Sequence, residues 1–237
     1  MITREVRGAR VVFTDRHGGV SVGPYASANL GSHVGDDAAA VAENRRRASV
    51  SAGIAPPEGW VALAQVHGRA VACCDAPPPA PAVADAAVTT ATGLPLVVVV
   101  ADCAPIALVA DHAVAAVHAG WPGLEQGVIE AAVDEVRRAS PGAIHAVLGP
   151  CIHPERYEFG ADLLERLVAR LGDGVVGRTA AGTPALDIPA AVRISLARAG
   201  VDRLDDVGEC TAASPDYFSY RRDGRTGRQA MFVVREG

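Results

Sequence analysis

Three residues of the sequence have side chains that could hold a metal ion together. They are His67 in the segment AQVHG, Cys103 in VVVVADCAP and His118 in AVHAGW, and each stands where a run of strand-forming residues ends. Two imidazoles and one thiolate are typical zinc ligands, and a site with three protein ligands keeps its fourth position free for water or substrate. The trio therefore predicts a catalytic metal site, provided that these strand ends converge.

The same side chains allow a reaction without metal. Cys103 would then be the nucleophile, with His118 or His67 as its base and Asp102 as the residue that orients the base. Two histidines around one sulfur suit a cation at least equally well. The metal site is therefore the preferred interpretation, and the cysteine nucleophile is the alternative.

Copper fits the sequence less well than zinc. A blue-copper centre also uses two histidines and one cysteine, but it needs a weak axial ligand, commonly methionine, and the chain has only Met1 and Met231. The histidines form no H-x-H pair of the kind found in multicopper clusters, and the P-C-x-x-C segment of zinc nucleobase deaminases is absent. We therefore expect Zn²⁺, with Cu²⁺ as the alternative.

Two loops that combine arginine with glycine could bind an anion, RHGGVSVGPYASANLG at 16–31 and FSYRRDGRTGR at 218–228. Backbone amides in such loops can cradle an oxyanion, and arginine binds phosphate through two parallel hydrogen bonds. The alternative is that these arginines are solvated surface residues. The candidate phosphate ligands are Arg16, Arg221, Arg222, Arg225 and Arg228, and the aromatic residues that could stack on a base are Tyr25, Tyr217, Phe218 and Tyr220.

Strands and helices alternate irregularly between these motifs. A helix is predicted over 38–52, because Asp36 and Asp37 can accept hydrogen bonds from its first amides. Further helices are predicted over 123–139, around 163–171 and between Pro189 and Gly200. The runs of apolar and β-branched residues predict strands over 10–14, 61–66, 96–101, 106–110, 113–118, 143–148 and 229–234.

Two segments have no helical or strand period. Residues 15–35 form a long glycine-rich loop, and such a loop inside a compact domain is usually functional, because some contact must offset the entropy of ordering it. Residues 75–86 contain four prolines among alanines and predict an extended surface segment.

Composition excludes several classes of function. The 237 residues carry 22 basic and 27 acidic side chains, a net charge of −5 that argues against nucleic acid as a partner. All the basic residues are arginine, which excludes a Schiff-base lysine, lysine-bound pyridoxal phosphate and a P-loop lysine. We expect one domain over 1–237.

A cytoplasmic location is expected for three reasons. No apolar run follows the arginines of the first ten residues, as it would in a secretory signal. The uncharged stretch 86–101 is too short to span a bilayer. Five scattered cysteines suit a reducing compartment better than a disulfide framework. No membrane partner is therefore expected.

Seven motifs follow one another along the chain: TDRHGGVSVGPYASANLGSHVGDD, ENR, QVHG, ADCAP, AAVHAGW, LGPCIHPERYEFG and FSYRRDGRTGR. In this order they resemble the motifs of the YfiH/YlmD family, whose members are also named laccase-domain proteins, polyphenol oxidases or peptidoglycan editing factors. The resemblance covers nearly the whole chain, so chance similarity is improbable.

The resemblance implies an α+β fold of mixed β-sheets packed together with helices on the outer faces, as in the catalytic domain of cytotoxic necrotizing factor toxins. It implies that the metal ligands are His67, Cys103 and His118. Family members are described as purine nucleoside phosphorylases, so the resemblance implies phosphorolysis of adenosine, inosine and methylthioadenosine, with adenosine deamination as a possible second activity. Purine nucleosides and inorganic phosphate are therefore the expected partners. The expected catalytic residues are the three ligands and Asp102, and the expected substrate-binding residues are Arg16, Asn29, Gln65 and Arg222.

The other names of the family imply two alternative functions, a copper-dependent polyphenol oxidase and a peptidoglycan-precursor editing factor. One departure bears on phosphorolysis: many relatives read HAGWRG where this chain has Pro122 in place of the arginine. If that arginine holds phosphate in the relatives, phosphorolysis is expected to be weaker here unless Arg16 or Arg222 compensates. We expect the protein to be a monomer.

Overall fold

The strands of the protein form two large sheets in a computed structural model that describes all residues, 1–237. The first sheet has the order β1 (Ile2–Val6), β2 (Ala9–Phe13), β14 (Gln229–Arg235), β7 (Leu96–Val100), β3 (Val61–Ala64) and β5 (Ala82–Val83). The second has the order β13 (Arg203–Asp206), β10 (His145–Leu148), β8 (Ala104–Val109), β9 (Val114–Ala119), β6 (Ala86–Thr89) and β4 (Val71–Cys73). A small separate sheet pairs β11 (Val176–Arg178) with β12 (Pro184–Leu186).

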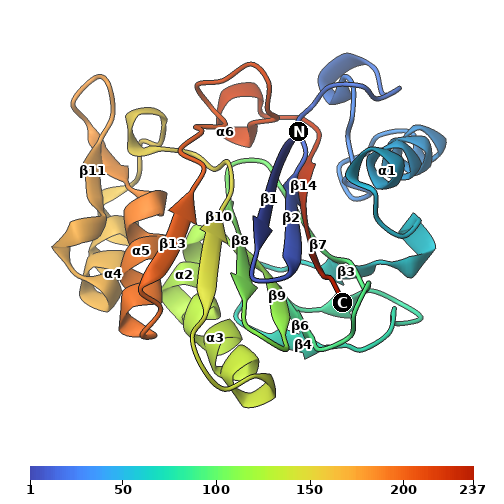
Figure 1. The fold of residues 1–237 in the computed structure, drawn as a ribbon. Helices are drawn as coiled ribbons and strands as arrows, with labels where there is room; N and C mark the ends of the chain where they lie inside the picture. Colours follow the sequence, from blue (N-terminus) through green and yellow to red (C-terminus); the bar gives the residue numbers. More distant parts are fainter.

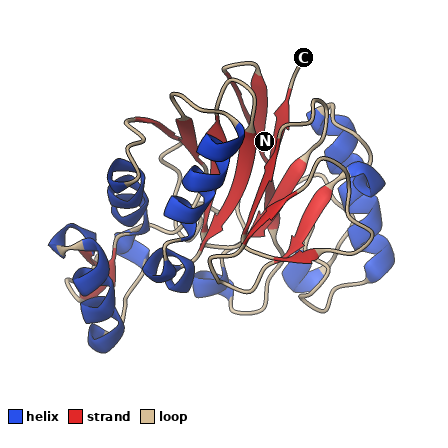
Figure 2. Ribbon diagram, turned by 90° about the horizontal axis from the view of Figure 1, so that it is seen from below, coloured by secondary structure: helices blue, strands red, loops and turns tan.

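Helices cover both outer faces of the stacked sheets, as Figures 1 and 2 show. Helix α1 (Ala38–Ala52) packs on the first sheet, and the longer of the other helices pack on the second, so the expected fold class is confirmed. The other helices are α2 (Trp121–Gln126), α3 (Val128–Ala139), α4 (Ala161–Leu171), α5 (Ile188–Arg198) and α6 (Tyr220–Asp223). Short 3-10 turns lie at Gly23–Tyr25, Pro57–Gly59, Pro154–Arg156 and Asp173–Val175.

Strands covered on both faces explain the apolar runs without polar alternation. In β14, Met231 and Val233 enter the core between the two sheets, whereas Ala230 and Phe232 face α1. Successive side chains of a strand point to opposite faces, so both sets must be apolar.

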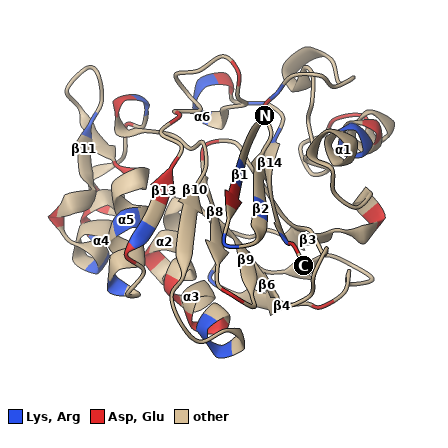
Figure 3. Ribbon diagram, viewed as in Figure 1, with Lys and Arg blue, Asp and Glu red and all other residues tan.

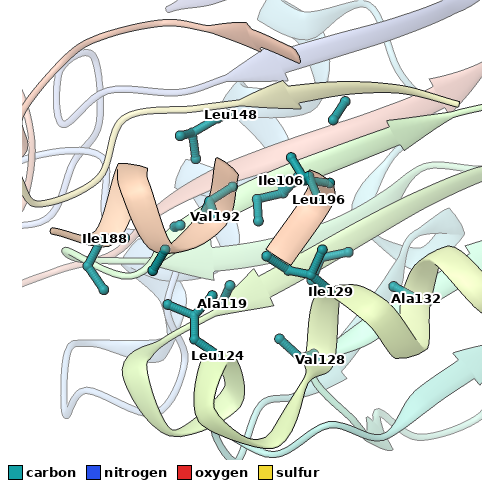
Figure 4. Packing of buried hydrophobic residues seen from close by; sticks show 14 of the residues in the cluster. Ile106, Ala119, Leu124, Val128, Ile129, Ala132, Leu148, Ile188, Val192 and Leu196 are labelled. Atoms are coloured by element: carbon teal, nitrogen blue, oxygen red, sulfur yellow. The ribbon is translucent and has the colours of Figure 1, made fainter. Parts of the chain in front are cut away.

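The largest core lies between the second sheet and its helices (Figure 4). Ile106 of β8 lies in the same cluster as Ile129 of α3 and the i, i+4 pair Val192 and Leu196 of α5. Full burial of each such side chain contributes about 1.5–3 kcal/mol. Charged residues are found mainly on helices and connecting loops (Figure 3).

Three chain connections cross between the two sheets at the same end of the molecule. β3, β5 and β7 run parallel in the first sheet, and β4, β6 and β8 of the second sheet follow them in turn. Because parallel strands end at the same edge, the connections that carry His67, Asp85 and Cys103 meet there. β9 runs antiparallel to β6 and β8 and brings His118 to the same end. We call this region the crossover end.

The helix expected over 123–139 is two helices. Gly127 has a left-handed backbone with φ of 84°, and its amide donates to the carbonyls of Gly123 and Leu124, which ends α2. Such a glycine is a common helix terminator. Helix α1, by contrast, has the predicted bounds, and Asp37 accepts a hydrogen bond of 2.8 Å from the Ala40 amide at its start.

The proline-rich surface segment is shorter than the expected 75–86. Its residues are mostly exposed up to Val83, but Ala84, Asp85 and Ala86 are buried, and Ala86 already belongs to β6. The last proline is Pro81, and beyond it the chain forms β5 and then crosses to the second sheet. The carboxylate of Asp85 therefore lies in the interior.

The glycine-rich loop 15–35 is irregular apart from one 3-10 turn, as expected. Buried Asn44 of α1 orders this loop, because its side-chain amide donates to Ser21, Ser27 and Asn29. No helix of the structure combines the length and the apolar character that crossing a bilayer requires.

Candidate metal centre and substrate cavity

His67, Cys103 and His118 come together at the crossover end. Cys103 Sγ lies 3.7 Å from His67 Nε2, the two imidazole centroids are 4.7 Å apart, and the three candidate donor atoms lie within 4.8 Å of one another. In a tetrahedral zinc site with bonds of about 2.0–2.3 Å, donor atoms stand about 3.5 Å apart. The spacing and the donor types therefore fit a single metal ion.

The three residues differ in their access to solvent. The His118 side chain is only 3% exposed, Cys103 is half-buried, and His67 is exposed. The group is thus closed on the side of the second sheet and open on the side of His67.

Asp85 lies directly behind the two histidines and is fully buried. Its Oδ1 is 2.8 Å from His118 Nδ1, and its two carboxylate oxygens also accept hydrogen bonds from the backbone amides of His67 and Gly68, at 2.9 and 2.7 Å. Burial alone would raise the pKa of Asp85, but the bonds from His118 and Gly68 outweigh it and lower the pKa below its usual value. Asp85 is therefore a carboxylate.

Cys103 and His118 favour each other's charged forms. Burial would raise the pKa of the Cys103 thiol, but the adjacent His118 and His67 outweigh it and bring the pKa to about 6. Burial would lower the pKa of His118, but Cys103 and Asp85 raise it to about 9. The two histidines thus favour the thiolate of Cys103, which is the form of cysteine that binds metals.

Gly120 leaves room for the metal ligands. A Cβ atom at this position would lie 2.6 Å from His67 Cδ2 and 3.0 Å from Cys103 Sγ. Real Cβ atoms essentially never come as close as 2.6 Å to another atom, and a contact of 3.0 Å is also unusually tight. The glycine of the HAGW motif is therefore required by the close approach of His67 and Cys103.

The group faces a cavity of about 550 Å³. One wall comes from strand ends and crossovers, and the opposite wall comes from α6 and neighbouring loops; Figure 1 shows α6 across one end of the strands. A cavity of this size falls in the range of small-molecule sites. Its lining residues are His33, Gln65, His67, Val99, Val100, Ala101, Asp102, Cys103, His118, Trp121, Tyr157, Tyr220, Arg221 and Arg228.

Two arginines contribute positive charge to the opposite wall. The Arg221 guanidinium lies 4.6 Å from the centre of the Tyr157 ring and donates to the carbonyl of Glu158. Arg228 donates through Nη1 to the carbonyls of Thr226 and Gly227, while its Nε and Nη2 groups have no hydrogen-bond acceptor within the chain. The wall therefore offers donors to an anionic ligand.

Two predicted site residues, Gln65 and Asp102, do line the cavity, but their polar groups bind the protein. Gln65 forms two hydrogen bonds of 2.9 Å with the backbone of Val99. Asp102 accepts from Thr211 Oγ1 and from the Arg221 amide, both at 2.7 Å. The Asp102 carboxylate therefore anchors the start of α6 to the crossover that carries Cys103.

The other three predicted substrate-binding residues lie outside this cavity. Arg222 donates to the carbonyls of Thr211, Ser214 and Tyr217 and pairs with Asp223. Arg16 donates to the carbonyl of Ala26 and lies 4.7 Å from the centre of the Phe218 ring. These contacts turn both guanidinium groups toward the protein itself, and neither residue lines this cavity.

Asn29 is fully buried and organises loops. Its side chain exchanges hydrogen bonds with the backbone of Gly31, donates to Asp36 and accepts from the Arg228 amide. Asn29 therefore reaches the cavity only indirectly, by fixing the backbone of Arg228.

Sequence reasoning did not select several residues of the site. Asp85 lay inside the segment assigned to the surface, although a carboxylate directly before a buried strand was a usable signal. Trp121 and Tyr157 stand in the HAGW and ERYEFG motifs, but nothing in their spacing indicated a common cavity. His33 comes from the glycine-rich loop, and burial followed by the charge of Arg228 lowers its pKa.

Comparisons with known proteins agree with this architecture. The family model described as multi-copper polyphenol oxidoreductase laccase matches residues 10–236. A purine nucleoside phosphorylase of Corynebacterium glutamicum is 43% identical over 234 residues, covering 96% of this chain and 94% of the relative. One of Streptomyces coelicolor is 45% identical over 236 residues, covering 96% of each.

A solved structure shows the same fold. The crystal structure of YlmD from Geobacillus stearothermophilus matches with a TM-score of 0.88 and 35% identity, covering 97% of this chain and 93% of that one. With the family model and the curated relatives, this confirms the resemblance seen in the motifs: the chain belongs to the YfiH/YlmD family.

Proposed function

We propose that this protein is a zinc-dependent purine nucleoside phosphorylase that acts on adenosine, inosine and methylthioadenosine. One observation carries the proposal: the His67–Cys103–His118 group and the guanidinium groups of Arg221 and Arg228 line the same cavity. Such a cavity has the chemistry to hold a nucleoside and a phosphate together. The names of the relatives in Corynebacterium and Streptomyces support the same reaction.

The donor set favours zinc over copper. Met231 is fully buried in the core between the sheets, and neither methionine lines the cavity, so a blue-copper axial ligand is not at hand. His67, Cys103 and His118 would hold the zinc, which when bound supplies a Lewis acid that can polarise an oxygen of phosphate or ribose.

In phosphorolysis, an oxygen of inorganic phosphate forms a bond to ribose C1′ while the bond between C1′ and the base nitrogen breaks. The electron pair of the broken bond leaves with the base, and the base takes up the proton that inorganic phosphate loses when it becomes the ester. Arg221 and Arg228 would bind the phosphate through their N–H groups, and the rings of Tyr220 and Trp121 offer apolar surface to the base. Holding both reactants in one cavity removes much of the entropic barrier.

Arg221 and Arg228 could also replace the charge of the arginine that this chain lacks in the HAGWRG motif. Pro122 lies in the first turn of α2, where proline is well tolerated, and it is not among the residues that line the cavity. The positive charge on the opposite wall comes instead from Arg221 and Arg228, not from Arg16 or Arg222.

Adenosine deamination is the less supported of the two reactions. Zinc deaminases use a glutamate beside the metal to transfer protons. The cavity contains no glutamate, and its one carboxylate, Asp102, already accepts two hydrogen bonds. Asp102 is therefore proposed as a positioning residue rather than a group that touches the substrate.

The test is to incubate the zinc-loaded protein with inosine or adenosine, with and without inorganic phosphate. We expect free base and ribose 1-phosphate only when phosphate is present, and about one zinc per chain by elemental analysis. Base release without phosphate would indicate a hydrolase instead. Oxygen uptake on a phenol by copper-loaded protein would favour the polyphenol oxidase, and no turnover despite bound zinc would favour the editing factor.

The cytoplasmic location and the monomeric state remain part of the proposal. Sedimentation of the purified protein tests the second, with a single species of the mass of one chain as the expected result.

A further inference from the structure

We propose that Asp85 is a positioning residue that sets both histidine ligands of the metal centre through one buried carboxylate. The inference rests on the metal role of His67, Cys103 and His118 proposed above. It concerns a residue that would touch neither the metal nor the substrate.

The first contact fixes the ring of His118. Oδ1 of Asp85 lies 2.8 Å from His118 Nδ1, and the backbone of Asp85 accepts a hydrogen bond of 2.7 Å from the His118 amide. A carboxylate only accepts, so the proton must stay on Nδ1. This leaves Nε2 of His118 as the nitrogen that binds the metal.

The second set of contacts fixes the backbone that carries His67. The amides of His67 and Gly68 donate to Oδ1 and Oδ2 of Asp85, at 2.9 and 2.7 Å, and the Val66 amide donates more weakly at 3.3 Å. His67 has a positive φ of 59°, which residues other than glycine rarely adopt. The carboxylate thus compensates an unfavourable turn that aims the His67 ring at Cys103.

The crossover topology explains how one residue serves both ligands. Asp85 directly precedes β6, which pairs with β9 beside His118, while the connection after β3 brings His67 to the same end. At 0% exposure, no water competes for the carboxylate. The position of each histidine therefore depends on the same two oxygen atoms.

The side-chain amide of an asparagine at position 85 could not accept the hydrogen bonds of both His118 and the backbone around His67. If the new side chain in Asp85→Asn kept its oxygen toward His118, its NH₂ group would face the Gly68 amide, a donor against a donor. If the side-chain amide were reversed, NH₂ would face His118 Nδ1 and move the ring proton to Nε2, the metal-binding nitrogen. Because this substitution hardly changes the side-chain volume, it separates positioning from packing.

The experiment measures zinc affinity by competition with a chromogenic chelator for wild type, Asp85→Asn and a control, Asp187→Asn. Asp187 also accepts a backbone hydrogen bond, from the Ala190 amide at the start of α5, but contacts no ligand. We expect Asp85→Asn to bind zinc about 10–100-fold more weakly, as for other partners of metal-ligating histidines, and Asp187→Asn to bind as wild type does. The cobalt-loaded Asp85→Asn protein should also show an altered thiolate-to-cobalt absorption band.

Zinc affinity of Asp85→Asn within about twofold of wild type would overturn the inference, even if the variant melted at a lower temperature. Should the variant fail to fold, long-range ¹H–¹⁵N spectra of zinc-loaded wild type decide the question. Protonated Nδ1 and metal-bound Nε2 in His118 support the role of Asp85, and the reverse assignment overturns it. Wild-type protein that takes up no zinc would instead overturn the proposed function.

Discussion

The two walls of the cavity are built differently. The metal wall consists of crossovers and strand ends from both sheets, and its most buried ligand, His118, is 3% exposed. The opposite wall consists of the four-residue helix α6 and adjoining loops, where the side chain of Tyr220 is 61% exposed. One wall is fixed by two sheets, and the other by single hydrogen bonds such as those from the Arg221 amide to Asp102 and from the Arg228 amide to Asn29.

The difference between the walls matches a difference in their tasks: one would hold the metal, and the other would bind the substrate. Metal ligands must be held to a fraction of an ångström, which strand ends and short connections between two sheets achieve. Substrate contacts can come from loops, which change more readily between related proteins. Two neighbouring residues of α6 differ in the same way. Arg221 lines the cavity, whereas Arg222 donates its hydrogen bonds to loop carbonyls.

The largest effect is expected at the metal wall. Cys103→Ala removes the only sulfur ligand and should abolish stoichiometric zinc binding, with a loss of several kcal/mol of transition-state stabilisation, or roughly 10³-fold or more in kcat/KM. Elemental analysis and phosphorolysis assays check the two effects. A variant that retained full activity without metal would contradict the site.

A smaller change on the same wall should still be severe. Gly120→Ala places a methyl group 2.6 Å from His67 Cδ2, so the ring must move away from Cys103. We expect zinc affinity to fall by at least about tenfold, the scale of effects from displaced ligands. The matched control is Gly160→Ala, which also caps a helix but whose Cβ would meet open space. Equal zinc affinity in both variants would argue against a steric requirement at Gly120.

The opposite wall should affect phosphate rather than metal. Arg228→Gln and Arg221→Gln each remove a charged donor from the cavity, and hydrogen bonds to charged groups contribute about 1.5–3 kcal/mol. The KM for phosphate should therefore rise roughly 10–150-fold, while zinc content stays unchanged. Loss of zinc in these variants would show that the two walls are not independent.

The smallest effect on catalysis is expected for the neighbouring arginine. Arg222→Gln removes bonds to three carbonyls and the pair with Asp223, so the free energy of unfolding should fall by about 1–3 kcal/mol. The KM for phosphate should stay near that of wild type. Urea unfolding and phosphate titration measure the two quantities, and a tenfold rise in KM would return Arg222 to the cavity.

The sequence was sufficient to propose the three metal ligands, the main helices and most buried strands. It did not show why the ligands meet, because their convergence depends on β3, β5 and β7 being parallel in one sheet, and strand order is not a local property. The prolines just before Asp85 predicted a surface segment, so the sequence did not indicate that Asp85 is buried. Arg221 and Arg222 are identical and adjacent in sequence, so only the direction of each side chain on α6 distinguishes them.

The crossover end also has a mechanical consequence. His67 and Cys103 lie on connections between the sheets, and His118 lies within the second sheet. An ion held by all three residues would therefore link the two sheets at the crossover end. Free metal at about 100 times its dissociation constant stabilises a folded protein by about 2.7 kcal/mol. Removing the metal with a chelator should then destabilise the crossover end more than the rest of the fold. Amide hydrogens near Asp85 and Gly68 should exchange with solvent sooner than those at the opposite end of the two sheets.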